Sequence, residues 1–307
     1  ASCEKTHARP TVSLFQSTCT RALGTRGDDS NDMLLARMTI PMAAIPRKVS
    51  WVGGKVRKWR IPVGLYNALP YLYASAGLLA MIRQDSVDPA LSRVLVVDGQ
   101  PAGVALVARR GWTSRLAAMA ILPAARAQGV GRAAMQRLLA EAKARGDRVM
   151  TLEVIEQNLP AIRLYTACGF RIDRRLAGYS GKPENGTSDL ALEEVDVRDA
   201  ARAVLAHGPA DLPWQLSGET LAQIGPPAVA YRAGDAWMIL NDPAAPTIVI
   251  RAVVTSPHAR QQELGSGLLR AVIARHPDRE WRAPAIWPEE MGGMFEQIGL
   301  RRGDLTQ

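Results

Sequence analysis

The sequence is poor in cysteine and histidine, with three residues of the first kind and four of the second among 307. Cys3, Cys19 and Cys168 form an odd set without a CxxC pair, which argues against a disulfide framework. No cysteine stands at a spacing from histidine that suits zinc, so we expect no metal site. Such cysteine usage is typical of a reducing compartment, and we expect a cytoplasmic protein.

Long uncharged stretches are scarce, and one of them raises the question of a membrane. Residues 61–82 carry no formal charge, and about 20 apolar residues suffice to span a bilayer. Pro62, Asn67, Pro70 and Ser75 interrupt this stretch, where a spanning helix needs unbroken Leu, Ile and Val. We predict two short buried helices broken at Pro70, and no membrane partner.

Most of the chain also lacks an excess of positive charge. Residues 1–60 hold 11 Lys and Arg against 4 Asp and Glu, so the totals of 38 and 29 leave 27 against 25 for the other 247 positions. We therefore do not expect the body of the protein to bind a polyanion. The basic run Lys48–Arg60, with Trp51 and Trp59, leaves nucleic-acid or anionic-lipid binding open. A solvated hairpin around Gly53 is the favoured interpretation, because charge runs usually face water.

A chain of 307 residues predicts two domains. Gly, Pro, Asn and Ser crowd residues 180–188, which indicates a linker. The first 32 residues are polar and lack the apolar stretch of a secretory signal. We expect a poorly ordered arm over residues 1–37, a first domain over 38–180, a linker over 181–189 and a second domain over 190–307.

Apolar periodicity predicts a similar succession of elements in both halves. In the first half, strands are expected at 93–98, 103–109, 117–122, 149–155 and 170–176, and helices at 131–145 and 160–167. In the second half, helices are expected at 197–207 and 267–275, and strands at 228–232, 236–240 and 247–254. This order predicts an α/β class with a mixed sheet in each half.

The most informative stretch is Met119–Arg132, MAILPAARAQGVGR. A predicted strand runs into Pro123, and glycines then open a predicted helix. Glycines at the start of a helix leave backbone N–H groups unshielded, and the helix dipole adds positive potential, so a pyrophosphate can bind there. The R-x-x-G-x-G string is short and by itself also fits an ordinary glycine-rich turn.

Residues further along the chain strengthen this interpretation. The sequence resembles the GNAT N-acetyltransferase family, whose pattern joins V-x-P-x-x-R-x-x-G-x-G to N-x-x-A-x-x-L-Y-x-x-x-G-F. The matching positions are Ile121, Pro123, Arg126, Gly129, Gly131, Asn158, Ala161, Leu164, Tyr165, Gly169 and Phe170.

The resemblance implies an acetyl-CoA-binding domain with defined roles for these residues. The backbone of Met119, Ala120 and Ile121 is expected to hold the acetyl and pantetheine part, and Asn158 to contact the pantetheine arm. Tyr165 is expected to protonate the departing thiolate, with a packing aromatic as the alternative. Arg126 belongs to the same site, and the pyrophosphate is expected on Ala127, Gln128, Gly129, Val130, Gly131 and Arg132.

Glu153 is the candidate base, because a primary ammonium must lose a proton before its nitrogen can attack. It precedes Tyr165 by twelve residues, as does the base proposed in the bacterial ribosomal-protein N-acetyltransferases to which this domain is similar. A strand glutamate that faces solvent is the alternative. Cys168 invites an acyl-enzyme mechanism, but without a nearby histidine we interpret it as a structural thiol.

The second half resembles a drifted copy of the same domain. Gln262, Gly265 and Gly267 satisfy Q-x-x-G-x-G before the helix predicted at 267–275. Phe295 stands where the tyrosine is expected, and Trp287 where the asparagine is expected. We expect this half to be inactive, with residual coenzyme A binding through its glycines left open.

We therefore expect two tandem GNAT-like domains, the first of which transfers acetyl from acetyl-CoA directly to a primary amine. The acceptor is a small-molecule amine, a protein N-terminus or a lysine, and a homodimer is left open. The alternatives are an acyl-CoA sensor or scaffold without catalysis, and a nucleic-acid binder that uses the basic arm.

Overall fold

A computed structural model describes residues 35–42, 79, 82–183 and 189–303. The hairpin expected at 48–59 and nearly all of the uncharged stretch 61–82 lie outside these residues. Among the described residues, no helix combines the length and apolar character needed to cross a membrane.

The described part of the first half contains six strands, the α-helices α3 and α4, and further helical residues at 79 and 82–84. The strands are β1 (Leu35–Pro41), β2 (Arg93–Val97), β3 (Gln100–Arg110), β4 (Thr113–Ile121), β5 (Val149–Ile155) and β6 (Arg171–Gly181). A 3-10 turn, η3 (Pro123–Ala125), precedes α3 (Val130–Ala144), and α4 (Leu159–Ala167) follows β5. β1 begins inside the segment expected as an arm and lies between β5 and β6 in the sheet.

The second half repeats this alternation. Its strands are β7 (Glu193–Val195), β8 (Val229–Ala233), β9 (Ala236–Leu240), β10 (Thr247–Thr255), β11 (Glu280–Pro288) and β12 (Arg301–Arg302). Its helices are α5 (Val197–His207), α6 (Gly218–Leu221), α7 (Leu264–Arg275) and α8 (Gly293–Glu296), with 3-10 turns η4 (Trp214–Leu216), η5 (Pro257–Gln262) and η6 (Glu289–Met291).

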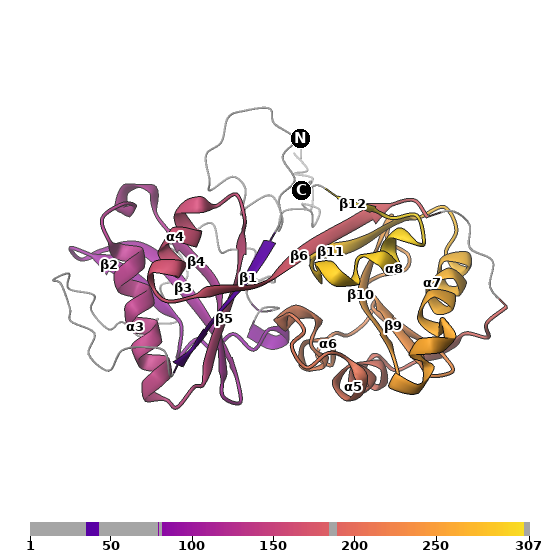
Figure 1. The fold of residues 1–307 in the computed structure, drawn as a ribbon. Coiled ribbons are helices and arrows are strands. Elements are labelled where there is room, and N and C mark those ends of the chain that lie inside the picture. The colour runs from indigo at the N-terminus through magenta and orange to yellow at the C-terminus, as the bar shows by residue number, and fades with distance from the viewer. Residues whose placement is uncertain (1–34, 43–78, 80–81, 184–188, 304–307) are drawn as a thin grey trace, which may run out of the picture.

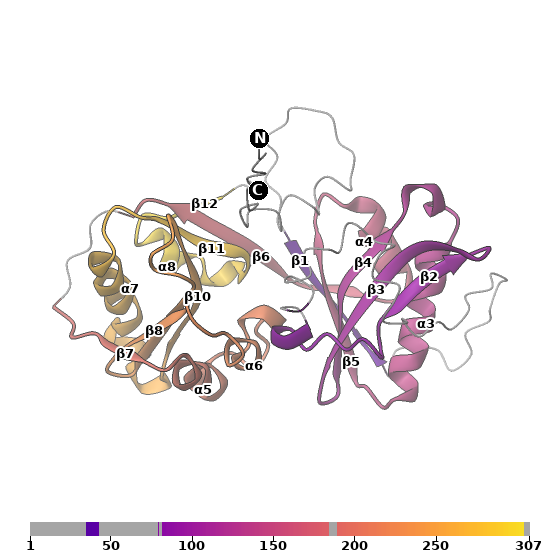
Figure 2. The same cartoon turned by 180° about the vertical axis from the view of Figure 1, so that it is seen from behind.

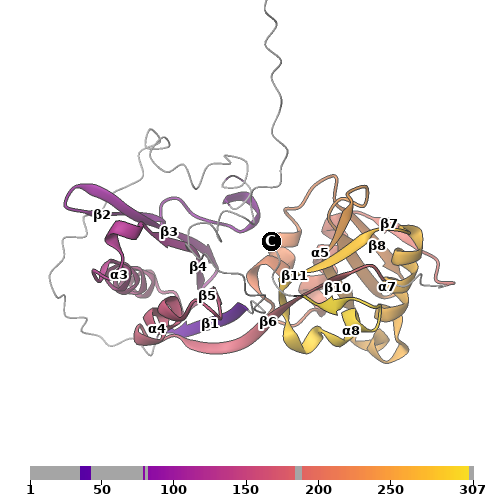
Figure 3. The same ribbon diagram turned by 90° about the horizontal axis from the view of Figure 1, so that it is seen from above.

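One mixed sheet runs through both halves, in the order β2-β3-β4-β5-β1-β6-β11-β10-β9-β8-β7. β6 is the shared strand: Arg171–Leu176 pairs with β1, and Leu176–Gly181 pairs with β11. Figures 1 and 3 show β6 passing from one half into the other. The sequence predicted a separate sheet in each half, whereas the halves share a continuous one.

Each half has its own apolar core. In the first, α3 and α4 pack on one face of the sheet through Met135, Leu138, Leu152 and Phe170, all at most 3% exposed. In the second, α7 packs against β9 and β10, with two tryptophans of β11, Trp281 and Trp287, in the same cluster. Burying such side chains contributes about 1.5–3 kcal/mol each.

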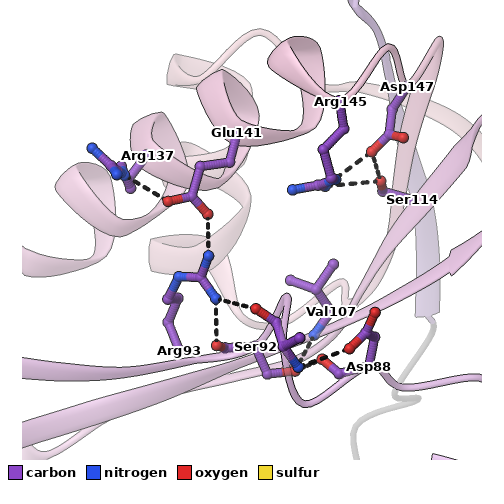
Figure 4. A network of polar contacts seen from close by, with 10 residues as sticks. Asp88, Ser92, Arg93, Val107, Ser114, Arg137, Glu141, Arg145 and Asp147 are labelled. Carbon is purple, nitrogen blue, oxygen red and sulfur yellow. Dashed lines mark hydrogen bonds and ion pairs between the residues drawn. The ribbon is translucent and has the colours of Figure 1, made fainter. Parts of the chain in front are cut away.

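A polar network fixes α3 against the sheet (Figure 4). Glu141 accepts hydrogen bonds from Arg93 of β2 at 2.6 Å and from Arg137 at 2.7 Å. Just beyond the helix, the fully buried carboxylate of Asp147 accepts hydrogen bonds from Ser114, from Arg109 at 2.6 Å and from Arg145 at 2.9 Å. The position of α3, and hence of its first turn, is therefore set by ionic contacts as well as by packing.

Candidate active site

The site begins where β4 and β5 separate. The two strands pair in parallel only from Thr113 to Leu116, opposite Val149–Leu152. A bulge at Ala117 interrupts the pairing of β4 with β3, and beyond it β4 keeps only β3 as a partner. Successive residues of a strand direct their N–H and C=O groups to opposite neighbours. The Leu122 N–H donates to the Ala102 carbonyl of β3, so the N–H and C=O groups of Met119, three residues earlier, face away from β3 and toward the gap between β4 and β5. Unpaired peptide groups therefore line the gap between the two strands.

The loop after β4 delivers a row of free amide groups to the first turn of α3. Ala127 and Gly129 have φ values of +59° and +78°, and Gly129 is the N-cap. Ala133 is the first residue of α3 whose N–H reaches a backbone acceptor, the Gly129 carbonyl at 3.0 Å. Within the described part of the chain, the N–H groups from Ala127 to Arg132 have no such acceptor. With no acidic residue in the first turn, this end of the 15-residue helix is suited to bind an anion.

Side chains of the loop hold its shape. Arg126 donates from Nε to the Ile121 carbonyl at 3.0 Å, and Gln128 donates to the Ala124 carbonyl at 2.7 Å. Gly131 has a different role from Gly129, because a Cβ there would lie 3.1 Å from Leu164 of α4. One glycine permits the left-handed turn, and the other permits close packing of α3 on α4.

Asn158 and Tyr165 lie on α4, beside the end of β5. The Asn158 side-chain oxygen caps α4 by accepting from the Ala161 N–H at 3.2 Å, which leaves its amide N–H groups for another partner. Tyr165 is 7% exposed, and its ring lies 6.0 Å from that of Phe170. Burial raises the pKa of Tyr165 to about 12, so the phenol is protonated at neutral pH. Burial also raises the pKa of the Cys168 thiol, which disfavours a thiolate nucleophile.

Glu153 lies on the sheet face that is turned toward the second half. Its Oε2 accepts from Arg115 Nε at 2.8 Å, and both side chains are less than one-tenth exposed. Asp85 approaches the same guanidinium, with Oδ2 4.0 Å from Nη1. Burial raises the pKa of Asp85, although the charges of Arg115, Arg110 and Arg251 oppose this shift. The expected base is therefore part of a buried charge cluster and does not face solvent.

The segment 209–217 of the second half covers this cluster. Trp214 donates from Nε1 to the Asp85 carbonyl at 2.7 Å, and Arg110 lies over the Trp214 ring, 4.3 Å from its centre. Arg110 also donates to Ser217 Oγ at 2.7 Å. Further along the sheet, Arg174 donates to Asp211 at 2.5 Å. Figure 2 shows α6, which follows this segment, on the side that faces the first half.

The second half has a matching strand separation but a different helix tip. β10 and β11 pair in parallel only from Thr247 to Val249, and a bulge at Arg251 follows. α7 already begins at Leu264, so Gly265 and Gly267 lie inside its first turn and not in a loop before it. The N-cap is Glu263, with φ +51°, and its carboxylate stands at the position of Gly129. The interpretation of Gln262, Gly265 and Gly267 as a motif that precedes the helix was therefore wrong in register. Both glycines lie within α7, where they permit close packing: a Cβ would lie 3.0 Å from Thr255 at Gly265 and 2.7 Å from Leu190 at Gly267.

Sequence reasoning missed Arg115, Asp85 and Arg251. Arg115 and Arg251 each interrupt an apolar strand, and a charged residue at such a position is a signal for a buried polar site. Asp85 had no comparable signal, because its role depends on contacts between distant segments. The described residues contain no group of three or more His, Cys, Asp and Glu side chains arranged to hold a metal ion.

Comparisons with known proteins agree with this geometry. Residues 62–170 match the model of the Acetyltransferase (GNAT) family. Among solved structures, the chain is similar to a protein from Pyrococcus horikoshii assigned as an acetyltransferase, with 13% identity, 76% of this chain and 77% of that chain covered, and a TM-score of 0.53. No curated protein matches the sequence at a significant level.

Two further structures are more distant in shape. A tandem GNAT protein from the clavulanic acid biosynthesis pathway is 18% identical, with 73% of this chain and 84% of that chain covered and a TM-score of 0.47. A GCN5-related N-acetyltransferase from Sphaerobacter thermophilus is 21% identical, with a TM-score of 0.40; the match covers 47% of this chain and only 50% of that protein. The Pyrococcus structure supports the fold, and its coverage extends over both halves of the chain.

Proposed function

We propose that this chain, whose residues 62–170 match the GNAT acetyltransferase family, transfers the acetyl group of acetyl-CoA directly to a primary amine. The observation that carries the proposal is the row of backbone N–H groups from Ala127 to Arg132, at the positive end of α3 and without backbone acceptors. A pyrophosphate supplies the acceptors and the negative charge that these groups lack.

The remaining parts of acetyl-CoA fit the neighbouring residues. The backbone of β4 from Met119 to Ile121 lies beyond the pairing with β5, and its peptide groups that face away from β3 can bind a pantetheine chain that enters the gap between β4 and β5. Asn158, the N-cap of α4 just after β5, uses its side-chain oxygen as the cap and can offer its amide N–H groups to the same pantetheine chain. When bound, acetyl-CoA supplies a thioester that an amine can attack.

Glu153 and Tyr165 serve the two proton transfers of this reaction. Arg115 binds Oε2 of Glu153, and Oε1, which has no hydrogen bond among the described residues, takes the proton from the incoming ammonium. As the C–S bond breaks, the neutral phenol of Tyr165 donates its proton to the departing sulfur, and the second proton that the amine nitrogen loses as the amide forms restores the phenol. Arg115 is a positioning residue, because its guanidinium fixes the direction of the Glu153 carboxylate.

Glu153→Gln tests this assignment, because the amide keeps the size of the side chain and removes the base. We expect thiol release from acetyl-CoA, measured against a panel of primary amines, to fall about 100-fold near pH 7. The loss should shrink as the pH approaches the pKa of the amine, where solvent alone supplies neutral nucleophile. An unchanged rate and pH profile would remove Glu153 from this role.

The second readout is binding of acetyl-CoA itself. A protein that binds acetyl-CoA but releases no thiol with any amine contradicts the proposed transfer and supports a sensor or scaffold. A protein that does not bind acetyl-CoA contradicts the site as a whole.

A further inference from the structure

A second polar site lies in the wedge between β10 and β11. It is lined by Arg251 and Trp287 together with apolar side chains of α5, the segment after it and η6, among them Val204, Leu212, Leu216 and Met291. The space open to a water-sized molecule is about 20 Å³, and one water needs about 10–15 Å³ on this measure. The wedge is therefore too small for a pantetheine chain and admits a single small polar group, such as the carboxylate end of a larger molecule.

Both polar side chains of the wedge lack a partner in the described part of the chain. Trp287 is 2% exposed, and its Nε1–H is buried without a hydrogen-bond acceptor. Arg251 Nε is buried and equally unpaired, and its side chain forms no ion pair among the described residues. Leaving a buried donor unsatisfied costs about 1–3 kcal/mol, and more for a charged group. Two such donors on the walls of one wedge indicate a missing acceptor of negative charge.

The wedge borders the active site. Leu212 and Leu216 line it, while their neighbours Asp211 and Trp214 contact Arg174 and Asp85 of the first half. The charges of Arg251 and Glu153 both act on the pKa of Asp85, so these two side chains lie near the same carboxylate. A small molecule held at Arg251 therefore lies beside the charge cluster that contains the proposed base.

We infer that the wedge binds the carboxylate of the acceptor, so that the acceptor belongs to the amino-acid class: a primary amine with a carboxylate and an apolar body. Arg251 and the Trp287 N–H bind the carboxylate oxygens, and the rest of the ligand extends out of the wedge, which has no room for it. This inference rests on the proposed acetyl transfer, which assigns no acceptor class.

The test compares three probes with the same apolar body: leucine, leucinamide and isopentylamine. We expect kcat/KM for leucine to exceed that for the two probes without a carboxylate by at least about 10-fold, since a charged hydrogen bond is worth about 1.5–3 kcal/mol. Arg251→Met should abolish this preference by raising KM for leucine with little change in kcat. Trp287→Phe, which removes the N–H, should weaken it a few-fold.

Arg202→Met is the matched control, because Arg202 lies on α5 with a 71% exposed side chain outside the wedge. This variant should keep the preference for leucine. Equal kcat/KM for leucine and leucinamide, or a preference that survives Arg251→Met, overturns the inference and leaves acetyl transfer to amines intact.

4-Methylpentanoate, which is leucine without its amine, separates the wedge from the reaction. Calorimetry should show 4-methylpentanoate binding to the wild-type chain and to Arg202→Met, and no binding to Arg251→Met. Absence of binding to the wild type overturns the inference even if no amine is acetylated. Binding that depends on Arg251, without any acetylation of leucine, overturns the assignment of the wedge to the acceptor.

Discussion

The two halves share an arrangement of strands and helices but differ in the charged side chains that they place on it. In each, a parallel strand pair separates at a bulge, at Ala117 in the first half and at Arg251 in the second. In each, a helix follows whose N-cap residue has positive φ, Gly129 or Glu263. In the first half, the N-terminus of α3 carries no acidic side chain and suits an anion. In the second half, the acidic residue Glu263 is the N-cap of α7 and the cationic residue Arg251 lines the wedge, so the charges are placed the other way round. The fold alone therefore does not determine which half binds acetyl-CoA.

The largest expected effect concerns the anchor of α3. Asp147 and Asp278 stand at the same offset after α3 and α7, but Asp147 is fully buried with three donors whereas the Asp278 side chain is 84% exposed. Asp147→Asn should lower the free energy of unfolding by about 3 kcal/mol, because the buried side chain loses its charge-assisted hydrogen bonds with Arg109 and Arg145, whose side chains are partly exposed. Asp278→Asn should change it by less than about 1 kcal/mol, since exposed ion pairs contribute little.

The pH dependence of the Asp147 effect has a defined sign. Burial alone raises the pKa of Asp147, but its hydrogen bonds with Ser114, Arg109 and Arg145 outweigh burial and hold the pKa below its usual range. The stabilisation is therefore present above the unfolded value of about 3.9 and is lost as the pH falls through the folded pKa. Denaturant titrations should show the wild type and Asp147→Asn converging below about pH 4; a difference that grows in acid contradicts this account.

The next effect concerns the proton donor. Tyr165→Phe removes the hydroxyl and should lower kcat about 100-fold, with acetyl-CoA affinity nearly unchanged. Tyr231→Phe is the matched control, because the Tyr231 hydroxyl contacts His276 in the second half, 3.0 Å away. Steady-state kinetics with thiol detection measure both variants. An equal loss in the two would show that the hydroxyl acts through folding.

The smallest effect tests the helix tips directly. Gly129→Glu gives the first half the N-cap of the second and should weaken acetyl-CoA binding about 30-fold, or about 2 kcal/mol. Gly129→Asn separates charge from backbone strain, because asparagine tolerates positive φ, and should cost only a few-fold. Calorimetry measures both affinities.

The reciprocal variant asks whether the carboxylate is the only obstacle in the second half. Glu263→Gly should leave the stoichiometry at one acetyl-CoA per chain, since the wedge between β10 and β11 remains too small for pantetheine. A second bound equivalent would contradict the view that the second half has lost this site.

The elements with strong local signals could be predicted from the sequence. β5 and α5 lie at the expected residues, and α3 and α4 within one residue of them. β11 was missed because Pro284 interrupts a clear alternation of buried and exposed residues. β1 was missed because its strand character depends on insertion between β5 and β6, which no local pattern records.

The candidate site divides in the same way. The loop Arg126–Arg132, Asn158 and Tyr165 could be found because they occupy fixed spacings along one segment, and their binding and catalytic roles stay predictions. The pairing of Glu153 with Arg115 and Asp85 could not be found, because it depends on where three separate segments meet. The predicted start of the helix at Gly267 was wrong, because α7 begins at Leu264 and includes both Gly265 and Gly267. The sequence does not show whether a helix begins before or after a glycine.

The shared strand β6 makes the halves mutually dependent. If the chain were cut after residue 183, the peptide groups of Leu176–Gly181 would lose β11 and β12 and become an open sheet edge. Such edges recruit strands from other molecules. An isolated first half would accordingly self-associate through β6, and the second half would be left without the strand that covers Trp281 and Trp287. Mixing the two fragments should restore a single particle by strand complementation.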